Sequence, residues 1–115
     1  MIDEATFRKL ADAVYRNVLA RLDLEDPDEV EAELQAGVVR IRLGHGKAEG
    51  GKVFILNHQA PLRELWYAAG DRAWHFALLD GRWRDAHHGG DLQDLLGETI
   101  SAELGRTVVF ELPRP

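Results

Sequence analysis

Hydrophobic residues recur along the first part of the chain with the spacing of an amphipathic helix. Between residues 4 and 22 they follow steps of three and four, which places them on one stripe that faces a core. Asp3 precedes this run and predicts an N-cap. An Asp-Pro-Asp sequence at 26–28 predicts a turn after the helix. The stripe consists of Phe7, Leu10, Ala11, Val14, Val18 and Leu22.

The central part of the chain alternates between hydrophobic and polar positions, which is typical of half-buried β-strands. In the first alternating segment, three glutamates point away from Val30, Ala32 and Leu34. Tight turns are indicated at 35–37 and at Asp80-Gly81, so strands that follow one another should pair antiparallel. The alternation predicts strands at 29–34, 38–43, 52–58, 62–69, 72–79 and 82–86.

A second amphipathic helix is predicted between Asp91, which can cap it, and Gly105, which can end it. Its apolar stripe consists of Leu92, Leu95, Leu96, Ile100 and Leu104. Residues 106–112 predict a last strand. Two amphipathic helices on one face of an antiparallel sheet of about six to seven strands form a two-layer α+β sandwich. The length of 115 residues suits one such domain, which we assign to 1–115.

The alternation also assigns the three tryptophans to the two faces of the sheet. Trp83, which lies between two arginines, and Trp74 are predicted in the core. Trp66 shares its face with Glu64, and burying an unpaired glutamate is costly. This favours Trp66 on the open face, where tryptophan often anchors a contact. The alternative is a Trp66 that is packed in the core by its neighbours.

Negative charge is concentrated in one short segment. Residues 1–36 carry the whole formal net charge of −6, and residues 37–115 are balanced. Seven acids and no Lys or Arg lie within 23–33. They are Asp23, Glu25, Asp26, Asp28, Glu29, Glu31 and Glu33.

A block of carboxylates attracts cations or a basic partner, and carboxylates suit hard cations such as iron. Three glutamates on one strand face lie about 6.6 Å apart, so they cannot enclose one ion as a preformed cage does. Binding to them would be weak and sensitive to salt. The alternative is that the acids only solubilise an edge strand and prevent it from pairing with another sheet.

Composition and motifs exclude several other classes. The absence of cysteine excludes disulfides and thiolate sites, and it fits a cytoplasmic location. The N-terminus lacks the apolar region of a signal peptide, no apolar run could span a membrane, and the acidic balance argues against non-specific nucleic-acid binding. The five histidines lack the spacing of a zinc site, and Ser101 is the single serine. We therefore expect no enzyme, no membrane segment and no nucleic-acid partner.

The ordered set of motifs resembles the frataxin family in its bacterial CyaY form. An Asn-x-Gln-x-Pro segment at 57–61 is followed five residues later by Trp66, and then by Trp74-His75-Phe76. The Asp-Gly-Arg-Trp turn at 80–83 and the Thr-Val-Val-Phe segment at 107–110 also match. The likeness covers nearly the whole chain in the same order of elements.

This resemblance implies a non-enzymatic protein of iron–sulfur cluster assembly, with the frataxin fold. It implies weak binding of Fe²⁺ or Fe³⁺ by an acidic ridge, here Asp23, Glu25, Asp26, Asp28, Glu29, Glu31 and Glu33. It implies docking on a cysteine desulfurase and its scaffold protein through the sheet surface, here Asn57, Gln59, Pro61 and Trp66. The helix at 4–22 holds only Glu4 and Asp12 as acids, so the ridge is confined to 23–33. The loop at 44–51, which includes His45, is unusually rich in glycine.

A different class of function also remains open. A small acidic chaperone or adaptor could hold a polypeptide on the open sheet without any metal. Such chaperones usually dimerise and need an exposed apolar helix face, for which Leu19 is the candidate here. A frataxin-like protein of this kind is instead expected to be a monomer, so a mass measurement and an iron titration would separate the two classes.

Overall fold

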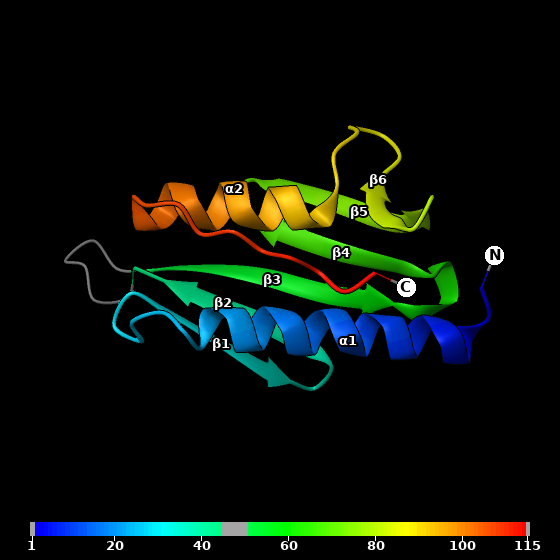
Figure 1. The fold of residues 1–115 in the computed structure, drawn as a ribbon, viewed down its shortest axis with the longest axis horizontal. Helices are drawn as coiled ribbons and strands as arrows, with labels where there is room; N and C mark the ends of the chain where they lie inside the picture. The colour runs from blue at the N-terminus through cyan, green and yellow to red at the C-terminus, as the bar shows by residue number, and fades with distance from the viewer. Residues whose placement is uncertain (1, 45–50, 115) are drawn as a thin grey trace.

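The computed structural model describes residues 2–44 and 51–114, and Figure 1 shows how their elements are arranged. His45 and most of the glycine-rich loop lie outside the described residues. The helices are α1 (Glu4–Leu22), α2 (Leu92–Leu104) and the short 3-10 helix η1 (Ala60–Leu62). The strands are β1 (Val30–Gln35), β2 (Val38–Leu43), β3 (Lys52–Gln59), β4 (Glu64–Ala69), β5 (Arg72–Leu79) and β6 (Arg82–Asp85).

The six strands form one antiparallel sheet in which neighbours along the chain are neighbours in space, in the order β1-β2-β3-β4-β5-β6. Two tight turns make this possible. Ala36 and Gly37 have φ values of 54° and 79°, and Asp80 and Gly81 have values of 52° and 76°. Two successive residues with positive φ match the twist of an antiparallel hairpin, so both predicted turns are confirmed.

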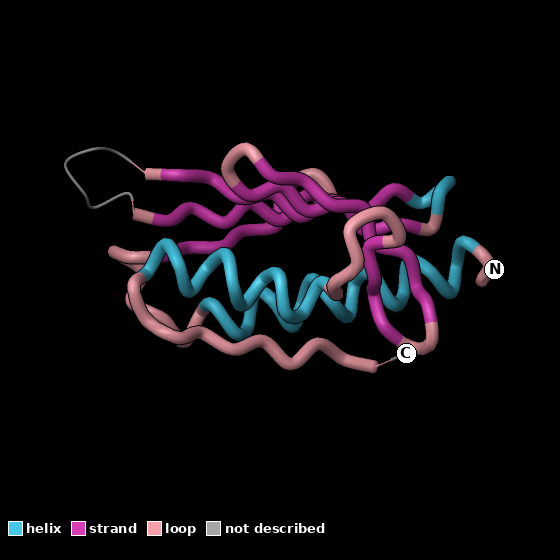
Figure 2. The backbone as a smooth tube through the Cα atoms, turned by 90° about the horizontal axis from the view of Figure 1, so that it is seen from above, coloured by secondary structure: helices cyan, strands magenta, loops and turns pink. Residues whose placement is uncertain are grey.

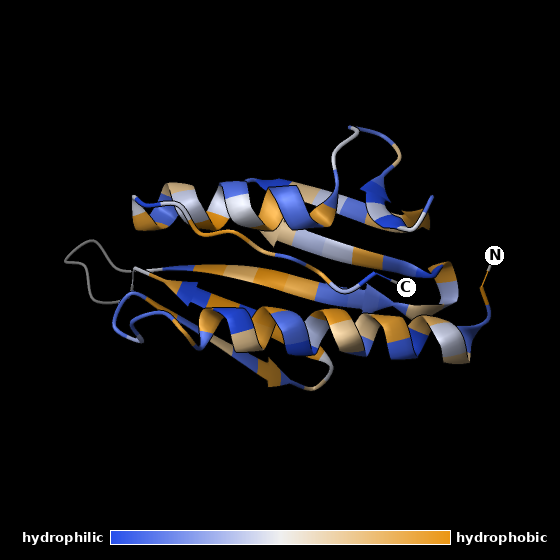
Figure 3. Cartoon of the chain, in the orientation of Figure 1, coloured by the Kyte–Doolittle hydropathy of each residue, from blue (hydrophilic) through white to orange (hydrophobic). Residues whose placement is uncertain are grey.

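The molecule has two layers, with both long helices on one face of the sheet (Figure 2). Each helix carries hydrophobic and hydrophilic residues side by side along its length (Figure 3), as the predicted stripes require. Asp3 and Asp91 cap the two helices by accepting backbone N–H bonds from Thr6 and Asp94. The predicted two-layer α+β sandwich is therefore confirmed. Neither helix of the described chain is long and apolar enough to cross a membrane.

Two polar side chains join the core although the hydrophobic stripes omit them. Tyr15 is 2% exposed and Thr99 is 8% exposed. The Tyr15 hydroxyl donates to the Gly37 carbonyl at 2.9 Å, and the Thr99 hydroxyl lies 2.8 Å from the Tyr67 hydroxyl. Each buried hydroxyl thus has a partner, which removes the penalty that would otherwise keep it at the surface.

The predicted last strand at 106–112 was wrong. This segment runs between α1 and α2 on the side of the helices that faces away from the sheet (Figures 1 and 2). Val108 and Phe110 are buried, so the alternation was real, but the neighbours are helices. Helix side chains therefore take the place of a strand ladder in bonding its backbone. The donors and acceptors are Asn17, Arg21, Gln93 and Ser101.

Four of the predicted strands also differ from the structure by one or two residues at their ends. The segment predicted as a strand from residue 62 begins instead at Glu64, because η1 occupies Ala60–Leu62 and Arg63, which ends it, lies in the left-handed region. On β1, exposure rises from 1% at Val30 to 51% at Leu34. Figure 1 shows β1 extending out beyond α1. Leu34 therefore lies on the same side of β1 as the buried Val30, but the helix does not cover it and it stays exposed.

Candidate functional site

The acidic ridge, which we define as the seven acids within 23–33, lies where α1 ends and β1 begins. Asp23 caps the C-terminal end of α1. The Asp26 side chain accepts the Asp28 backbone N–H at 2.9 Å, and the Asp26 carbonyl accepts from the backbone of Glu29 and Val30. These bonds hold the connection in one conformation, so the ridge is part of the folded domain and not a loose acidic tail.

Two of the ridge acids, Glu25 and Glu29, are held by arginines that lie outside the acidic segment. Glu25 accepts from Arg21 at 2.8 Å and from Arg106 at 2.6 Å. Arg106 also bonds Glu29 at 2.5 Å. Hydrogen bonds from Arg21 and then Arg106 lower the pKa of Glu25, and the same two glutamates raise the pKa of Arg106. Charge-assisted bonds of this kind favour the ionised form of both partners.

A third ridge acid is paired across the sheet. Glu31 lies opposite Arg42 in the β1–β2 register and forms an ion pair with it. Glu33 lies opposite Arg40 but forms no ion pair with any described residue. The ridge thus divides into the paired acids Glu25, Glu29 and Glu31 and the free acids Asp23, Asp26, Asp28 and Glu33, which have no ion pair in the described chain.

Members of both sets line one shallow hollow of about 290 Å³ between the end of α1 and β1. Its acidic lining residues are Asp23, Glu25, Glu31 and Glu33. Within the described residues, no three His, Asp or Glu side chains converge as a metal site requires. The ridge can therefore attract a hydrated cation through its field, with one or two carboxylates in contact, but it is not a cage for a resident ion.

The open sheet face carries an aromatic pair. Trp66 and His75 lie directly opposite each other on β4 and β5, and their rings stack with centroids 4.0 Å apart and an interplanar angle of 8°. The Trp66 Nε1–H donates to the Glu64 carboxylate at 2.9 Å. Leu65 and Tyr67, on either side of Trp66, are buried toward the helices. The predicted assignment of Trp66 to the open face is confirmed.

The other predicted contact residues surround this pair to different degrees. Asn57 is paired with Trp66 and Gln59 with Glu64 in the β3–β4 register, so both lie on the open face beside the tryptophan. Pro61 lies in η1, beyond the end of the ladder and at the edge of that face. Sequence reasoning did not select His75 as part of this surface, although a tight turn at 70–71 places it opposite Trp66.

The histidines do not form a separate centre within the described residues. His58 lies on the core side of β3, where its ring packs near Phe7 and Tyr15. His87 and His88 are exposed. Their backbone N–H groups both bond the buried Asp85 carboxylate at 2.8 Å.

Asp85 serves as an anchor for the end of the β5–β6 hairpin. Its carboxylate also accepts the backbone N–H of His75 at 3.1 Å, where the strand ladder has ended. Burial works to raise the pKa of Asp85, but the N–H donors of His88, His87 and His75 outweigh it and the pKa is lowered. Asp85 is therefore a structural carboxylate and not a candidate acid or base.

A two-layer sandwich with an acidic ridge at one end and an open, tryptophan-bearing sheet face defines a small class of proteins. The sequence profile of the frataxin-like domain family matches residues 1–106 of this chain. The chain therefore belongs to the frataxin-like family, as its motifs indicated.

Solved structures show the same fold. The frataxin from Psychromonas ingrahamii, a member of the CyaY protein family, matches with a TM-score of 0.81 and 22% identity over 96% of this chain and 99% of that chain. Trimeric frataxin from the yeast Saccharomyces cerevisiae with its full-length N-terminus matches with a TM-score of 0.66 and 27% identity, over 84% and 79% of the two chains. The same yeast protein complexed with ferrous iron matches with a TM-score of 0.66 and 23% identity, over 92% and 89%.

Proposed function

We propose that this protein is a non-enzymatic, iron-binding regulator and iron donor of iron–sulfur cluster assembly. In this proposal the acidic ridge and the open sheet face dock together on a cysteine desulfurase and its scaffold protein. Membership of the frataxin-like family supports the proposal, as does the yeast relative that was solved with ferrous iron.

The observation that carries the proposal is that both surfaces can reach the same partner. Trp66 on β4 lies in the same row across the sheet as Gln35 on β1, and Glu33 is two residues from Gln35, so Glu33 and Trp66 share the open sheet face. Three strand spacings across the sheet and two residues along β1 separate them, which together is roughly 16 Å. A partner interface of ordinary size spans more than this distance, so one basic surface could contact the ridge and the tryptophan at once.

The two surfaces would make different contributions to binding. The free acids supply long-range attraction, which speeds association and weakens as salt is added. Trp66 supplies a large apolar surface whose orientation is already fixed by Glu64 and His75, so little side-chain entropy is lost on binding. Iron is cargo in this proposal, and the free acids would hold Fe²⁺ weakly and release it easily.

The proposal is tested by measuring desulfurase affinity at low and at high salt. The test variant replaces three free acids (Asp23→Asn, Asp28→Asn and Glu33→Gln). A matched control makes the same change in net charge far from the ridge (Asp71→Asn, Asp80→Asn and Asp94→Asn). We expect the test variant to lose about tenfold in affinity at about 0.1 M salt and the control to lose much less, since at that ionic strength exposed charges more than about 10 Å from a contact are largely screened.

The result also decides against the metal-free chaperone. An acidic chaperone would bind an unfolded polypeptide in both variants and would show no selective loss for the desulfurase. Equal losses in the test and control variants would show that net charge alone matters, and the ridge would then have no role as a docking surface.

A further inference from the structure

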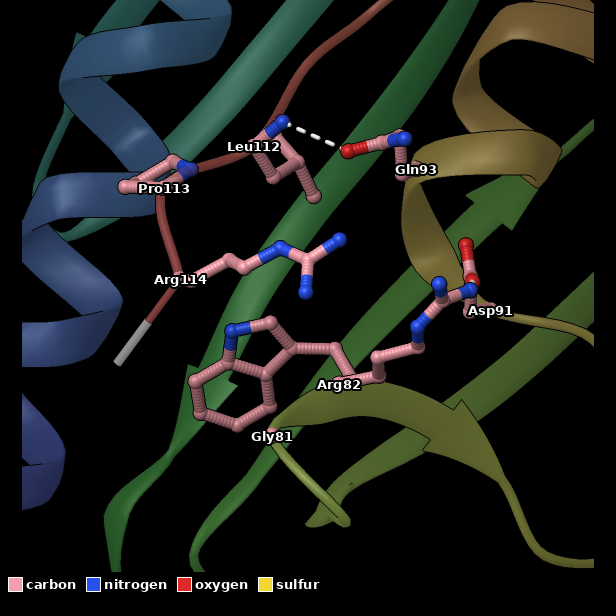
Figure 4. A pocket seen from close by; sticks show the side chains of 8 residues that line it. Gly81, Arg82, Asp91, Gln93, Leu112, Pro113 and Arg114 are labelled. Carbon is pink, nitrogen blue, oxygen red and sulfur yellow. Dashed lines mark hydrogen bonds and ion pairs between the residues drawn. The ribbon is translucent and has the colours of Figure 1, made fainter.

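A second polar site lies away from the ridge and from the open face. It is a pocket of about 60 Å³ between the β5–β6 turn, the start of α2 and the C-terminal segment. This volume is several times the roughly 10–15 Å³ that one ordered water requires, so the pocket can hold a small polyatomic group. Figure 4 shows side chains from all three segments around it.

The lining of the pocket is rich in hydrogen-bond donors. The Arg114 guanidinium points toward the side where Arg82, Asp91 and Gln93 lie (Figure 4), and it has no ion pair with any residue that the structure describes. The Gln93 carbonyl oxygen accepts the Leu112 backbone N–H at 2.8 Å. This fixes the orientation of the Gln93 amide and leaves its NH₂ group as a donor.

The single carboxylate in the pocket is already satisfied. One oxygen of Asp91 accepts the Asp94 backbone N–H at 3.1 Å as the cap of α2. The other oxygen bonds Arg82 at 3.2 Å. Arg82 and Arg114 together outweigh this one negative charge, so the pocket is locally positive in a chain whose formal net charge is −6.

The floor of the pocket holds a hydrogen-bond donor without a partner. Trp83 lines the pocket and is only 4% exposed as a whole residue, and its indole N–H makes no hydrogen bond to any other described residue. Tryptophans in protein interiors usually place this N–H on an acceptor. The indole nitrogen itself is not fully buried, so an acceptor in the pocket can bond it without breaking a contact inside the protein. The adjoining N-terminus of α2 adds a partial positive charge in the same place.

We propose that this pocket binds a small oxyanion, a phosphate or a carboxylate group, between Arg82, Arg114 and the Trp83 indole N–H. Guanidinium groups match the geometry of such oxyanions and can bond two oxygens at once. A cation is disfavoured, since the two arginines face it and the Asp91 oxygens are already in use. Because the ligand would touch β6, the start of α2 and the C-terminal segment together, it would also tie that segment to the rest of the fold.

The test is an NMR titration of the whole protein that follows the three tryptophan indole N–H signals. Sodium phosphate and sodium acetate are added separately, at a constant ionic strength that is kept with sodium chloride. We expect a saturable shift of the Trp83 signal and of the first backbone amides of α2, while the Trp66 and Trp74 signals serve as internal references. A tighter response to phosphate would assign the site to phosphate groups, and a tighter response to acetate would assign it to carboxylates.

Two charge-matched variants decide whether the pocket is responsible. Arg114→Gln should weaken the apparent affinity at least tenfold, because it removes the guanidinium that has no other partner. Arg40→Gln removes the same charge from the open face of β2, away from the residues that line the pocket, and should leave the titration unchanged. The proposal is overturned if neither anion gives a saturable Trp83 shift, or if Arg114→Gln responds as the unmodified protein does.

Discussion

The acidic ridge and the open sheet face organise their functional side chains in opposite ways. On the ridge, ion pairs remove part of what the sequence suggests, because arginines at positions 21, 42 and 106 hold three of the seven acids. On the sheet face, short-range contacts add what the sequence does not show, because Glu64 and His75 fix the orientation of Trp66.

This difference shows that charge density along a sequence overstates the field of a folded surface. Of the seven ridge acids, four have no ion pair with a described residue, namely Asp23, Asp26, Asp28 and Glu33. About half of the acidic block is therefore available to a cation or a basic partner. An aromatic side chain on an open sheet, in contrast, becomes a better binding group on folding. Its neighbours fix its orientation before a partner binds, so less side-chain entropy is lost in the complex.

The largest effect is expected from removing the aromatic anchor of the sheet face. Trp66→Ala should weaken the complex with the desulfurase and scaffold about thirtyfold or more, because truncation of a tryptophan hot spot costs roughly 2 kcal/mol or more. Calorimetric titration measures this loss. Trp66→Phe, which keeps an aromatic ring opposite His75, is the control and should lose much less.

The unfolding transition of Trp66→Ala checks the fold assignment at the same time. Trp66 is half-buried on the face opposite the helices, so the variant should remain folded. A variant that does not fold would mean that Trp66 belongs to the core after all, and the comparison between the two surfaces would lose its basis.

A second, smaller effect should separate the free acids from the paired acids. The free-acid variant (Asp23→Asn, Asp28→Asn and Glu33→Gln) and a paired-acid variant (Glu25→Gln, Glu29→Gln and Glu31→Gln) change the net charge equally. The free-acid variant should bind Fe²⁺ about tenfold less tightly at low salt, because it loses both negative potential and the carboxylates that are available to contact the ion. The paired-acid variant should lose less affinity, because its carboxylates already bond arginines.

Stability should distinguish the two variants. The paired-acid variant should lose free energy of unfolding, since Arg21, Arg42 and Arg106 then lose their partners. The free-acid variant should keep or slightly gain stability, because mutual repulsion is relieved. Urea unfolding measures both, and a loss of stability in the free-acid variant would contradict the division of the ridge into two sets.

Much of this fold could be predicted from the sequence because its signals are local. The alternation around Trp66 predicted the sheet face on which this side chain lies, and the Asp80-Gly81 turn predicted the β5–β6 hairpin. Both signals depend only on residues that are near neighbours in the sequence. The C-terminal segment was misassigned because alternation at Val108 and Phe110 reports burial of one side of the segment but not whether strands or helices cover that side.

The ion pairs that Arg106 forms with the ridge could not be predicted for a related reason. Arg106 lies 77 residues from Glu29 and 81 residues from Glu25 along the chain, and no local pattern links them. The partner of Arg106 is set by where the C-terminal segment leaves α2. The split between paired and free acids is therefore a property of the tertiary structure.

The smallest effect is a dependence of stability on pH that arises from Glu25. Its pKa is lowered in the folded protein from an ordinary value of 4.5, so its ion pairs stabilise the fold fully above that value. Their contribution is lost as the pH falls through the lowered pKa. The stability difference between the unmodified protein and Glu25→Gln should thus be constant near neutral pH and shrink in acid.

Chemical unfolding at a series of pH values checks this dependence. Glu33→Gln is the control, because Glu33 has no ion pair in the described chain and its replacement should change stability little at any pH. A Glu25→Gln difference that grows as the pH falls would have the wrong sign for a carboxylate that is stabilised by arginines.

The central claim is that the uncompensated carboxylates of the ridge are where positive charge binds. It is tested most directly by adding Fe²⁺ to the protein in stages and following paramagnetic broadening of each backbone amide by NMR. We predict that the amides of Asp23, Asp26, Asp28 and Glu33 broaden first, and that those of Trp66 and His75 stay sharp. Broadening that begins at His87 and His88, or no broadening along the ridge, would contradict the account.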